Sequence, residues 1–252
     1  MADGTAARAA RLDSSAPHIP NAHSYSDLVD WGTQPDPIAG SSASRGRLLY
    51  KRDEDGERTV ESGLWVCTPG SWRLSIPGDE ICYFLEGRAT YTEHNGDTIE
   101  VGPETVVHFP SGWTGRCDVK ETIRNTYMLT RTPSVIDREA TPVMRKPKEI
   151  GNLVDWGAVP TMIEGQSMTS GRLLHKGPGG RSETGIWVCT PGLWNCHVTS
   201  DEYCHFIAGR CTYTHESGEI IEIEPDTVAF FPKDWRGTSK VHETVRKVYM
   251  IR

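Results

Sequence analysis

Residues 63–72 read GLWVCTPGSW, and residues 185–194 repeat them almost unchanged as GIWVCTPGLW. From these two stretches onward the chain aligns with itself without a gap, and about half of the paired residues are identical. The ETIR sequence at 121–124, for example, returns as ETVR at 243–246. The period of more than 100 residues exceeds the roughly 20–50 residues of solenoid repeats. The sequence therefore indicates the duplication of one domain.

The repeat also extends upstream of these stretches. LVDWG at 28–32 returns at 153–157, and GRLLYK at 46–51 returns as GRLLHK at 171–176. Almost the whole chain is therefore present in two copies.

The segments outside the repeat differ from it in composition. Residues 1–24 are rich in Ala, Arg, Ser and Pro, which is typical of a flexible tail or of an arm that orders on a partner subunit. The segment between the copies contains three prolines and reads as a connector. The predicted organisation is an N-terminal tail at 1–24, a first domain at 25–131, a linker at 132–150 and a second domain at 151–252.

Both copies have the pattern of short β-strands. The runs ICYFL at 81–85 and YCHFI at 203–207 are followed closely by glycines, and the later Asn-Gly and Ser-Gly pairs suit tight hairpin turns. No stretch of a dozen residues shows convincing helical periodicity. Many short strands with Gly and Pro between them predict an all-β fold of two small barrels, packed as an internal pseudo-dimer.

Composition excludes several classes of protein. The 252 residues carry a net charge of −7, whereas nucleic-acid binders usually carry a basic surplus. No apolar run approaches the roughly 18 residues of a membrane span. The seven cysteines include no CxxC pair, and the first residues have no apolar secretory core. We expect a reduced cytoplasmic protein that binds neither nucleic acid nor membrane.

At the level of motifs, each copy resembles a cupin domain. The resemblance rests on WVCTPG, on DE-x-C-x-F-x-x-G, and on the closing E-T-[IV]-R followed by Tyr127 or Tyr249. It is strongest toward the group of the ethanolamine-utilisation cupin and the ureidoglycine aminohydrolases, and it covers about residues 28–131 and 153–252. It implies two tandem jelly-roll β-barrels, a fold that hosts many unrelated reactions.

The resemblance also implies where a metal would bind. Metal-binding cupins usually offer two His separated by one residue, then a Glu, then a later His. In the second copy these positions hold Asn195, His197, Glu202 and Gly237. The expected site is a depleted divalent centre for Mn, Fe, Zn or Ni, with Asn195, His197 and Glu202 as ligands and His175 as an additional donor.

The first copy departs further from the metal-binding pattern. Its matching positions hold Arg73, Ser75, Glu80 and Gly115, so we expect no metal in the N-terminal barrel. The second copy also departs from the ureidoglycine aminohydrolases at three of their four ligand positions, which speaks against that reaction.

A pocket can also work without a metal. Alternation along a strand places Cys204 on the same side as Glu202, so His197, Glu202 and Cys204 form a candidate acid/base cluster. The second copy has also gained imidazoles where the first has other residues, which favours the second barrel as the active one. The predicted substrate-binding residues are Trp187, Trp194, Trp235, Phe206 and His175.

Three functions remain open from the sequence. The preferred one is an enzyme that performs proton transfer, hydrolysis, elimination or isomerisation on a small polar metabolite in the C-terminal barrel. The first alternative is a metal-free cupin that binds a small molecule or has a structural role. The second is an iron-dependent oxygenase, which normally needs two His and a carboxylate. We expect a small-molecule ligand as partner, and a homodimer formed through the N-terminal arm or the LVDWG strands.

Overall fold

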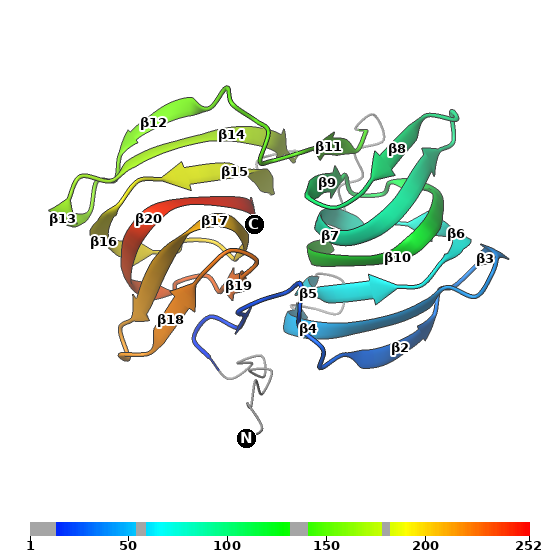
Figure 1. Ribbon diagram of the computed structural model, residues 1–252, viewed down its shortest axis with the longest axis horizontal. Helices are drawn as coiled ribbons and strands as arrows, with labels where there is room; N and C mark the ends of the chain where they lie inside the picture. The colour runs from blue at the N-terminus through cyan, green and yellow to red at the C-terminus, as the bar shows by residue number, and fades with distance from the viewer. Residues whose placement is uncertain (1–13, 54–58, 132–140, 178–181) are drawn as a thin grey trace, which may run out of the picture.

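The computed structural model describes residues 14–53, 59–131, 141–177 and 182–252. These residues form strands, turns and loops (Figure 1). The first domain contains β2 (Val29–Thr33), β3 (Pro37–Ala39), β4 (Ala43–Asp53), β5 (Thr59–Cys67), β6 (Gly70–Ser75), β7 (Gly78–Glu93), β8 (Thr98–Val101), β9 (Thr105–Phe109) and β10 (Thr114–Arg131). The second contains β12 (Val154–Ala158), β13 (Met162–Gly165), β14 (Met168–Lys176), β15 (Glu183–Cys189), β16 (Gly192–His197), β17 (Glu202–His215), β18 (Ile220–Ile223), β19 (Val228–Phe231) and β20 (Arg236–Ile251).

The two domains have the same topology. One sheet runs in the order β11-β9-β7-β10-β5-β4-β2 and the other in the order β1-β19-β17-β20-β15-β14-β12, where β1 is His18–Ile19 and β11 is Val143–Arg145. In each sheet three strands lie off this path. They are β3, β6 and β8 in the first sheet and β13, β16 and β18 in the second. The prediction of an all-β fold with two tandem barrels is confirmed.

The long strands bend at the glycines that close the DE-x-C-x-F-x-x-G motif. Gly87 and Gly209 have φ values of 77° and 80°, a region that favours glycine. A Cβ on them would lie 2.1 Å from the Thr122 carbonyl oxygen and 2.2 Å from the Thr244 carbonyl oxygen. The glycines therefore allow β7 and β17 to cross closely over β10 and β20, which closes each barrel around its pocket.

The segments that precede the domains are exchanged between them. Strand β1 (His18–Ile19) pairs with β19 of the second barrel, and β11 (Val143–Arg145) pairs with β9 of the first. In Figure 1 the blue N-terminal segment runs from the first barrel to the second beside β19. Each barrel is thus completed by a strand that comes from just before the other.

This exchange corrects the prediction of a flexible tail for residues 14–24. Arg124 binds the carbonyl oxygens of Ala22 (3.1 Å) and Tyr25 (3.0 Å), and Arg246 binds that of Ile150 at 2.5 Å. The alternative prediction was an arm that orders on a partner subunit. The segment does lie against a barrel, but it is the second barrel of the same chain. Residues 1–13 lie outside the described part.

An apolar layer joins the two barrels. One core cluster contains buried residues of both domains, among them Ile81 and Met128 from the first and Val248 and Met250 from the second. Each barrel has its own inner core as well. No helix among the described residues is long and apolar enough to cross a membrane.

Candidate functional site

The second barrel holds a pocket of about 390 Å³. Its walls come from β12, β15, β16, β17, β19 and β20. The lining residues are Trp156, Glu183, Trp187, Trp194, Cys196, His197, Val198, Thr199, Ser200, Glu202, Tyr213, Phe231, Lys247, Tyr249 and Ile251. Aromatic walls around a few charged groups are typical of a small-molecule site.

A buried lysine occupies this pocket. The Lys247 ammonium lies 2.7 Å from Glu202 Oε1 and 3.2 Å from the Cys204 sulfur. The side chains of Lys247 and Glu202 are only 8% and 18% exposed. The ammonium also lies 4.9 Å from the centre of the Trp187 ring, within range of a cation–π contact. The pocket therefore contains a partly desolvated ion pair held against an aromatic wall.

The protonation states of this group follow from its surroundings. Burial works against the Lys247 ammonium, but the Glu202 carboxylate, 2.7 Å away, outweighs it and holds the pKa of Lys247 above its ordinary value. Burial, reinforced by Glu202, raises the pKa of Cys204 well above its ordinary value. Cys204 is therefore a thiol that donates to Glu202 Oε1 (3.3 Å), and a nucleophilic thiolate is disfavoured.

A second polar pair stands beside the first. The Tyr249 hydroxyl donates to Glu183 Oε1 at 3.0 Å. Burial, followed by the nearby Glu183 charge, raises the pKa of Tyr249, so Tyr249 stays protonated. The pocket thus offers an ammonium and a phenol as donors, with two carboxylates as acceptors.

The predicted metal ligands are not brought together. On β16 the side chains of Trp194 and Cys196 turn toward the interior, and those of Asn195 and His197 are exposed. His197 lies at the pocket mouth, with Nε2 3.4 Å from Asp234 Oδ1. Strand alternation explains why Asn195 and His197 do not point into the barrel as we expected. Trp194 and Cys196 face inward, so the residues that alternate with them face outward.

The Glu202 environment does not fit a divalent cation. The Lys247 ammonium already lies against this carboxylate at 2.7 Å, and a dication bound there would meet the positive charge at close range. The expected position of the later His, Gly237, is covered by the indole of Trp235, since a Cβ there would lie 2.7 Å from the ring. The donor set of the second barrel therefore argues against the barrel metal that we expected.

The predicted substrate-binding residues divide into two groups. Trp187 and Trp194 line the pocket. Trp235 does not line it; it packs in the barrel core, and its indole nitrogen donates to Ser15 Oγ at 3.1 Å. Phe206 also lies in that core, 5.8 Å from the Lys247 ammonium. His175 is on β14 of this barrel, but its ring packs against His108 of the first domain and not in the pocket.

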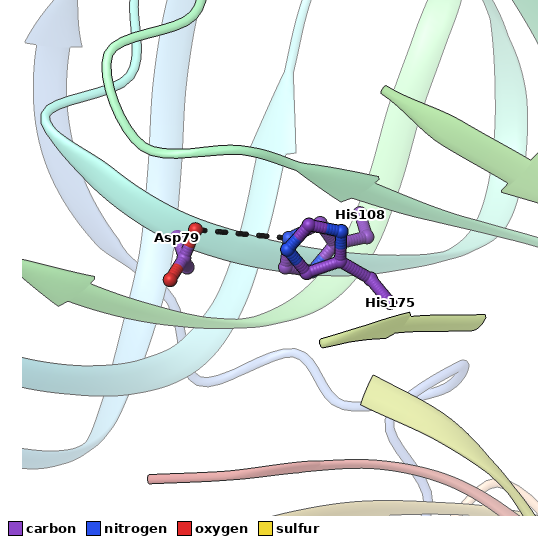
Figure 2. A group of neighbouring side chains, drawn as sticks. All are labelled: Asp79, His108 and His175. Carbon is purple, nitrogen blue, oxygen red and sulfur yellow. Dashed lines mark ion pairs between the residues drawn. The ribbon is translucent and has the colours of Figure 1, made fainter. Parts of the chain in front are cut away.

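Two of the imidazoles gained by the second copy lie between the barrels. His205 is buried, with Nδ1 3.0 Å from Thr126 Oγ1 and its ring stacked on Tyr83. His175 stacks on His108 of the first domain. Asp79, His108 and His175 form the one group of three metal-ligating side chains in the described ranges (Figure 2). This group lies between the barrels, away from the pocket of the second barrel.

The first barrel has a smaller pocket of about 290 Å³ with a related framework. Tyr127 donates to Glu61 at 2.7 Å, and Cys82 donates to Glu80 at 3.4 Å. Buried Asn125 stands where the second copy has Lys247. Burial, helped by the Glu61 charge, raises the pKa of Glu80 to about 7.

This shift makes stability depend on pH. The folded state keeps the Glu80 proton up to about pH 7, whereas the unfolded chain releases it near pH 4.3 (roughly the value of a free Glu). Stability therefore falls as pH rises through this window, and the cost is complete above it. We expect Glu80→Gln to stabilise the protein at pH 8 by about 3 kcal/mol and to change little at pH 4. Urea unfolding at both pH values measures this, and an equal gain at both would contradict it.

Sequence reasoning missed Lys247, Glu183 and Tyr249 as site residues. The signal for Lys247 was present, because a lysine there replaces Asn125 of the first copy and alternates with the aromatic Tyr249 along the last strand. Glu183 and Tyr249 gave a weaker signal, since Glu61 and Tyr127 occupy the same positions in the first copy.

The fold resembles several solved structures. A protein of unknown function from Pseudomonas syringae pv. tomato has a TM-score of 0.71 at 16% identity, covering 92% of this chain and 97% of that chain. The protein Ylba from E. coli has a TM-score of 0.58 at 11% identity, covering 94% and 90%. A cupin 2 conserved barrel domain protein from Leptotrichia buccalis has 0.57 at 8% identity, covering 87% and 91%. At these identities the likeness shows the fold alone.

The sequence itself matches a family model. The search of curated proteins returned no match. The model of the EutQ-like cupin domain, however, matches twice, at residues 54–127 and 176–249. Together these matches cover more than half of the chain, and they fall on the two barrels described above. The chain belongs to the EutQ-like cupin family, as a protein with two tandem cupin domains.

Proposed function

We propose that the second barrel catalyses a metal-free proton transfer on a small polar metabolite that carries a carbonyl group. The observation that carries the proposal is the buried contact between Lys247 and Glu202, with 2.7 Å between Nζ and Oε1. A carboxylate beside a fixed ammonium is suited to take a proton from carbon while the cation stabilises the charge that develops on the carbonyl oxygen.

The residues divide the work as follows. The Glu202 carboxylate accepts the proton from the carbon next to the carbonyl. The Lys247 ammonium donates a hydrogen bond to the carbonyl oxygen, which becomes an enolate oxygen in the reaction. The Cys204 thiol, which donates to Glu202 Oε1, orients the base. The aromatic rings of Trp187 and Trp194 enclose the substrate and limit the access of water.

Return of the proton to the same carbon or to another atom would make the reaction an isomerisation, and loss of a neighbouring group would make it an elimination. Both belong to the reaction classes expected from the sequence. All seven cysteines are free thiols, mostly buried, which supports a setting in the reducing cytoplasm.

Hydrogen–deuterium exchange tests the proposal without knowledge of the product. The protein is incubated in D₂O with a panel of small oxo acids, hydroxy ketones and aldoses, and deuterium incorporation at carbon is followed by NMR. We expect enzyme-dependent exchange with at least one compound. Glu202→Gln should lower it by at least about 100-fold.

Glu80→Gln is the matched control, because it alters the corresponding carboxylate of the first barrel. It should leave the exchange unchanged. Saturable binding of a compound without any exchange would contradict catalysis and would favour the metal-free binding module.

A further inference from the structure

The interface between the barrels contains a pair of stacked imidazoles beside a carboxylate. The rings of His108 on β9 and His175 on β14 have centroids 3.9 Å apart and planes inclined by 19°. Asp79 on β7 points its carboxylate toward the pair (Figure 2). The two domains thus each contribute to one polar cluster, which no part of the proposed reaction uses.

The other end of the same interface shows what this cluster replaces. The internal repeat relates His108 to Phe230 and His175 to Tyr50, and these two rings also stack, at 4.1 Å and 14°. There the matching carboxylate, Asp201, is paired with Arg52. One end of the interface is therefore aromatic with an arginine–aspartate pair, and the other carries imidazoles.

The arginine has no counterpart at the imidazole end. The repeat aligns Arg52 with Gly177, and a Cβ built on Gly177 would lie 3.3 Å from Asp79 Oδ2. Gly177 therefore brings bare backbone to the carboxylate where the other end supplies a cation. A partly buried carboxylate without that cation favours another positive partner.

His108 has the orientation of a metal ligand. Its Nδ1 lies 2.9 Å from Thr184 Oγ1, and a hydrogen bond at one ring nitrogen is what normally fixes a ligating imidazole. Its Nε2 is buried, has no hydrogen-bond partner among the described residues, and faces Asp79 Oδ1 at 3.8 Å. That distance is too long for a hydrogen bond. It is close to the roughly 3.3 Å between two ligands of one tetrahedral zinc ion.

The carboxylate is also held in place. Asp79 Oδ2 accepts from the Ser182 hydroxyl at 2.6 Å, and Oδ1 accepts from the Ser111 backbone N–H at 3.0 Å. One ligand atom from each of Asp79, His108 and His175 lies within 4.8 Å of the others. Stacked rings point their lone pairs in parallel, so one ring must turn to bind a shared ion. His175 is that ring, because it is half-buried while His108 is fully buried and bonded to Thr184.

We propose that Asp79, His108 and His175 bind a divalent transition-metal ion, for which zinc is the best match, and that this ion links the two barrels. Two imidazoles and one carboxylate are a common donor set for zinc, with water completing the shell. The site lies outside both barrels, so it is independent of the proton transfer proposed for the second pocket.

The test uses the full-length protein stripped with a chelator and titrated with Zn²⁺ by calorimetry and with Co²⁺ by visible absorption. We expect one equivalent of either ion, a visible Co²⁺ spectrum of low coordination number, and a rise in Tm on addition of Zn²⁺. The double variant His108→Phe/His175→Tyr installs the ring pair of the other end. It should fold, bind Zn²⁺ at least about 100-fold more weakly, and show no rise in Tm.

Two further variants keep the test decisive. Asp79→Asn preserves shape and should weaken Zn²⁺ binding even if the double variant does not fold. His197→Ala removes the imidazole at the mouth of the second pocket and should leave the binding unchanged. Absence of Zn²⁺ binding by the unmodified protein, or binding undiminished in both Asp79→Asn and the double variant, would overturn the proposal.

Discussion

Lys247→Met is expected to lower proton exchange in the second barrel by at least about 100-fold. Methionine has a similar length but no charge, so the variant removes the hydrogen bond and the positive charge at the carbonyl oxygen. It also leaves the Glu202 carboxylate, whose side chain is 18% exposed, without its cation. The rate of deuterium incorporation in D₂O, measured with a compound that the unmodified protein exchanges, gives the effect directly.

A loss of activity must be separated from a loss of folding. A single substitution in a buried ion pair leaves an unpaired charge and destabilises the protein, whereas removing both charges is often neutral or stabilising. The double variant Lys247→Met/Glu202→Gln should therefore have a Tm near that of the unmodified protein while remaining inactive. Circular dichroism and thermal melting check both variants.

Asn125→Ala is the matched control for the first barrel. Asn125 aligns with Lys247 in the repeat, and its substitution should leave the exchange rate unchanged. If Lys247→Met keeps most of the exchange rate, the ammonium is not part of the reaction. The proposed division of work between Lys247 and Glu202 would then be wrong.

The fold could be predicted because both copies need the same backbone. Gly87 and Gly209 recur because a Cβ at either position would meet a carbonyl oxygen at about 2 Å. The hairpin turns recur for the same kind of reason, since the backbone there restricts the residue type. A duplicated sequence displays such constraints twice, which made the all-β, two-barrel architecture readable from one chain.

The site was predicted less well, because alternation holds within a strand but does not carry across a connection. The face of Cys204 follows from Glu202 on the same strand, β17, and the structure places the two in contact at 3.3 Å. Asn195 and His197 lie on β16, beyond a turn, and there the inward residues are Trp194 and Cys196. The positions inferred for the metal ligands were therefore one residue out of phase.

The imidazoles gave a misleading signal for a similar reason. Their accumulation in the second copy suggested a tuned pocket, yet His175 and His205 face the first domain. Periodicity tells which residues share a face of a strand, but it does not tell which face packs on another domain. The replacement of Asn125 by Lys247 was the more informative difference, because a charged side chain on the inward face of a strand requires a partner.

Arg52→Met is expected to have the largest effect on stability among the substitutions at the domain interface. The Arg52 guanidinium binds both carboxylate oxygens of Asp201 across the interface, with 3.3 Å between Nη1 and Oδ1. The Asp201 side chain is only 2% exposed. Without Arg52, the carboxylate keeps the Lys233 backbone N–H at 2.8 Å but loses its cation. The Arg52 side chain is 37% exposed, so the cost comes from the buried carboxylate and falls at the low end of the range for breaking a buried pair, about 3 kcal/mol. This corresponds to a fall in Tm of roughly 6–12 °C for a chain of this size.

Two comparisons establish that the buried charge causes the fall. Asp201→Asn in the Arg52→Met background removes the unpaired charge and should restore most of the lost Tm. Lys51→Met on the same strand breaks a more exposed contact with Glu61, 3.5 Å long, and should change the free energy of unfolding by only about 0.5 kcal/mol. If Arg52→Met melts at the temperature of Lys51→Met, the pair is not a stabilising element. The comparison between Asp201 with Arg52 and Asp79 would then no longer support the need for a cation at Asp79.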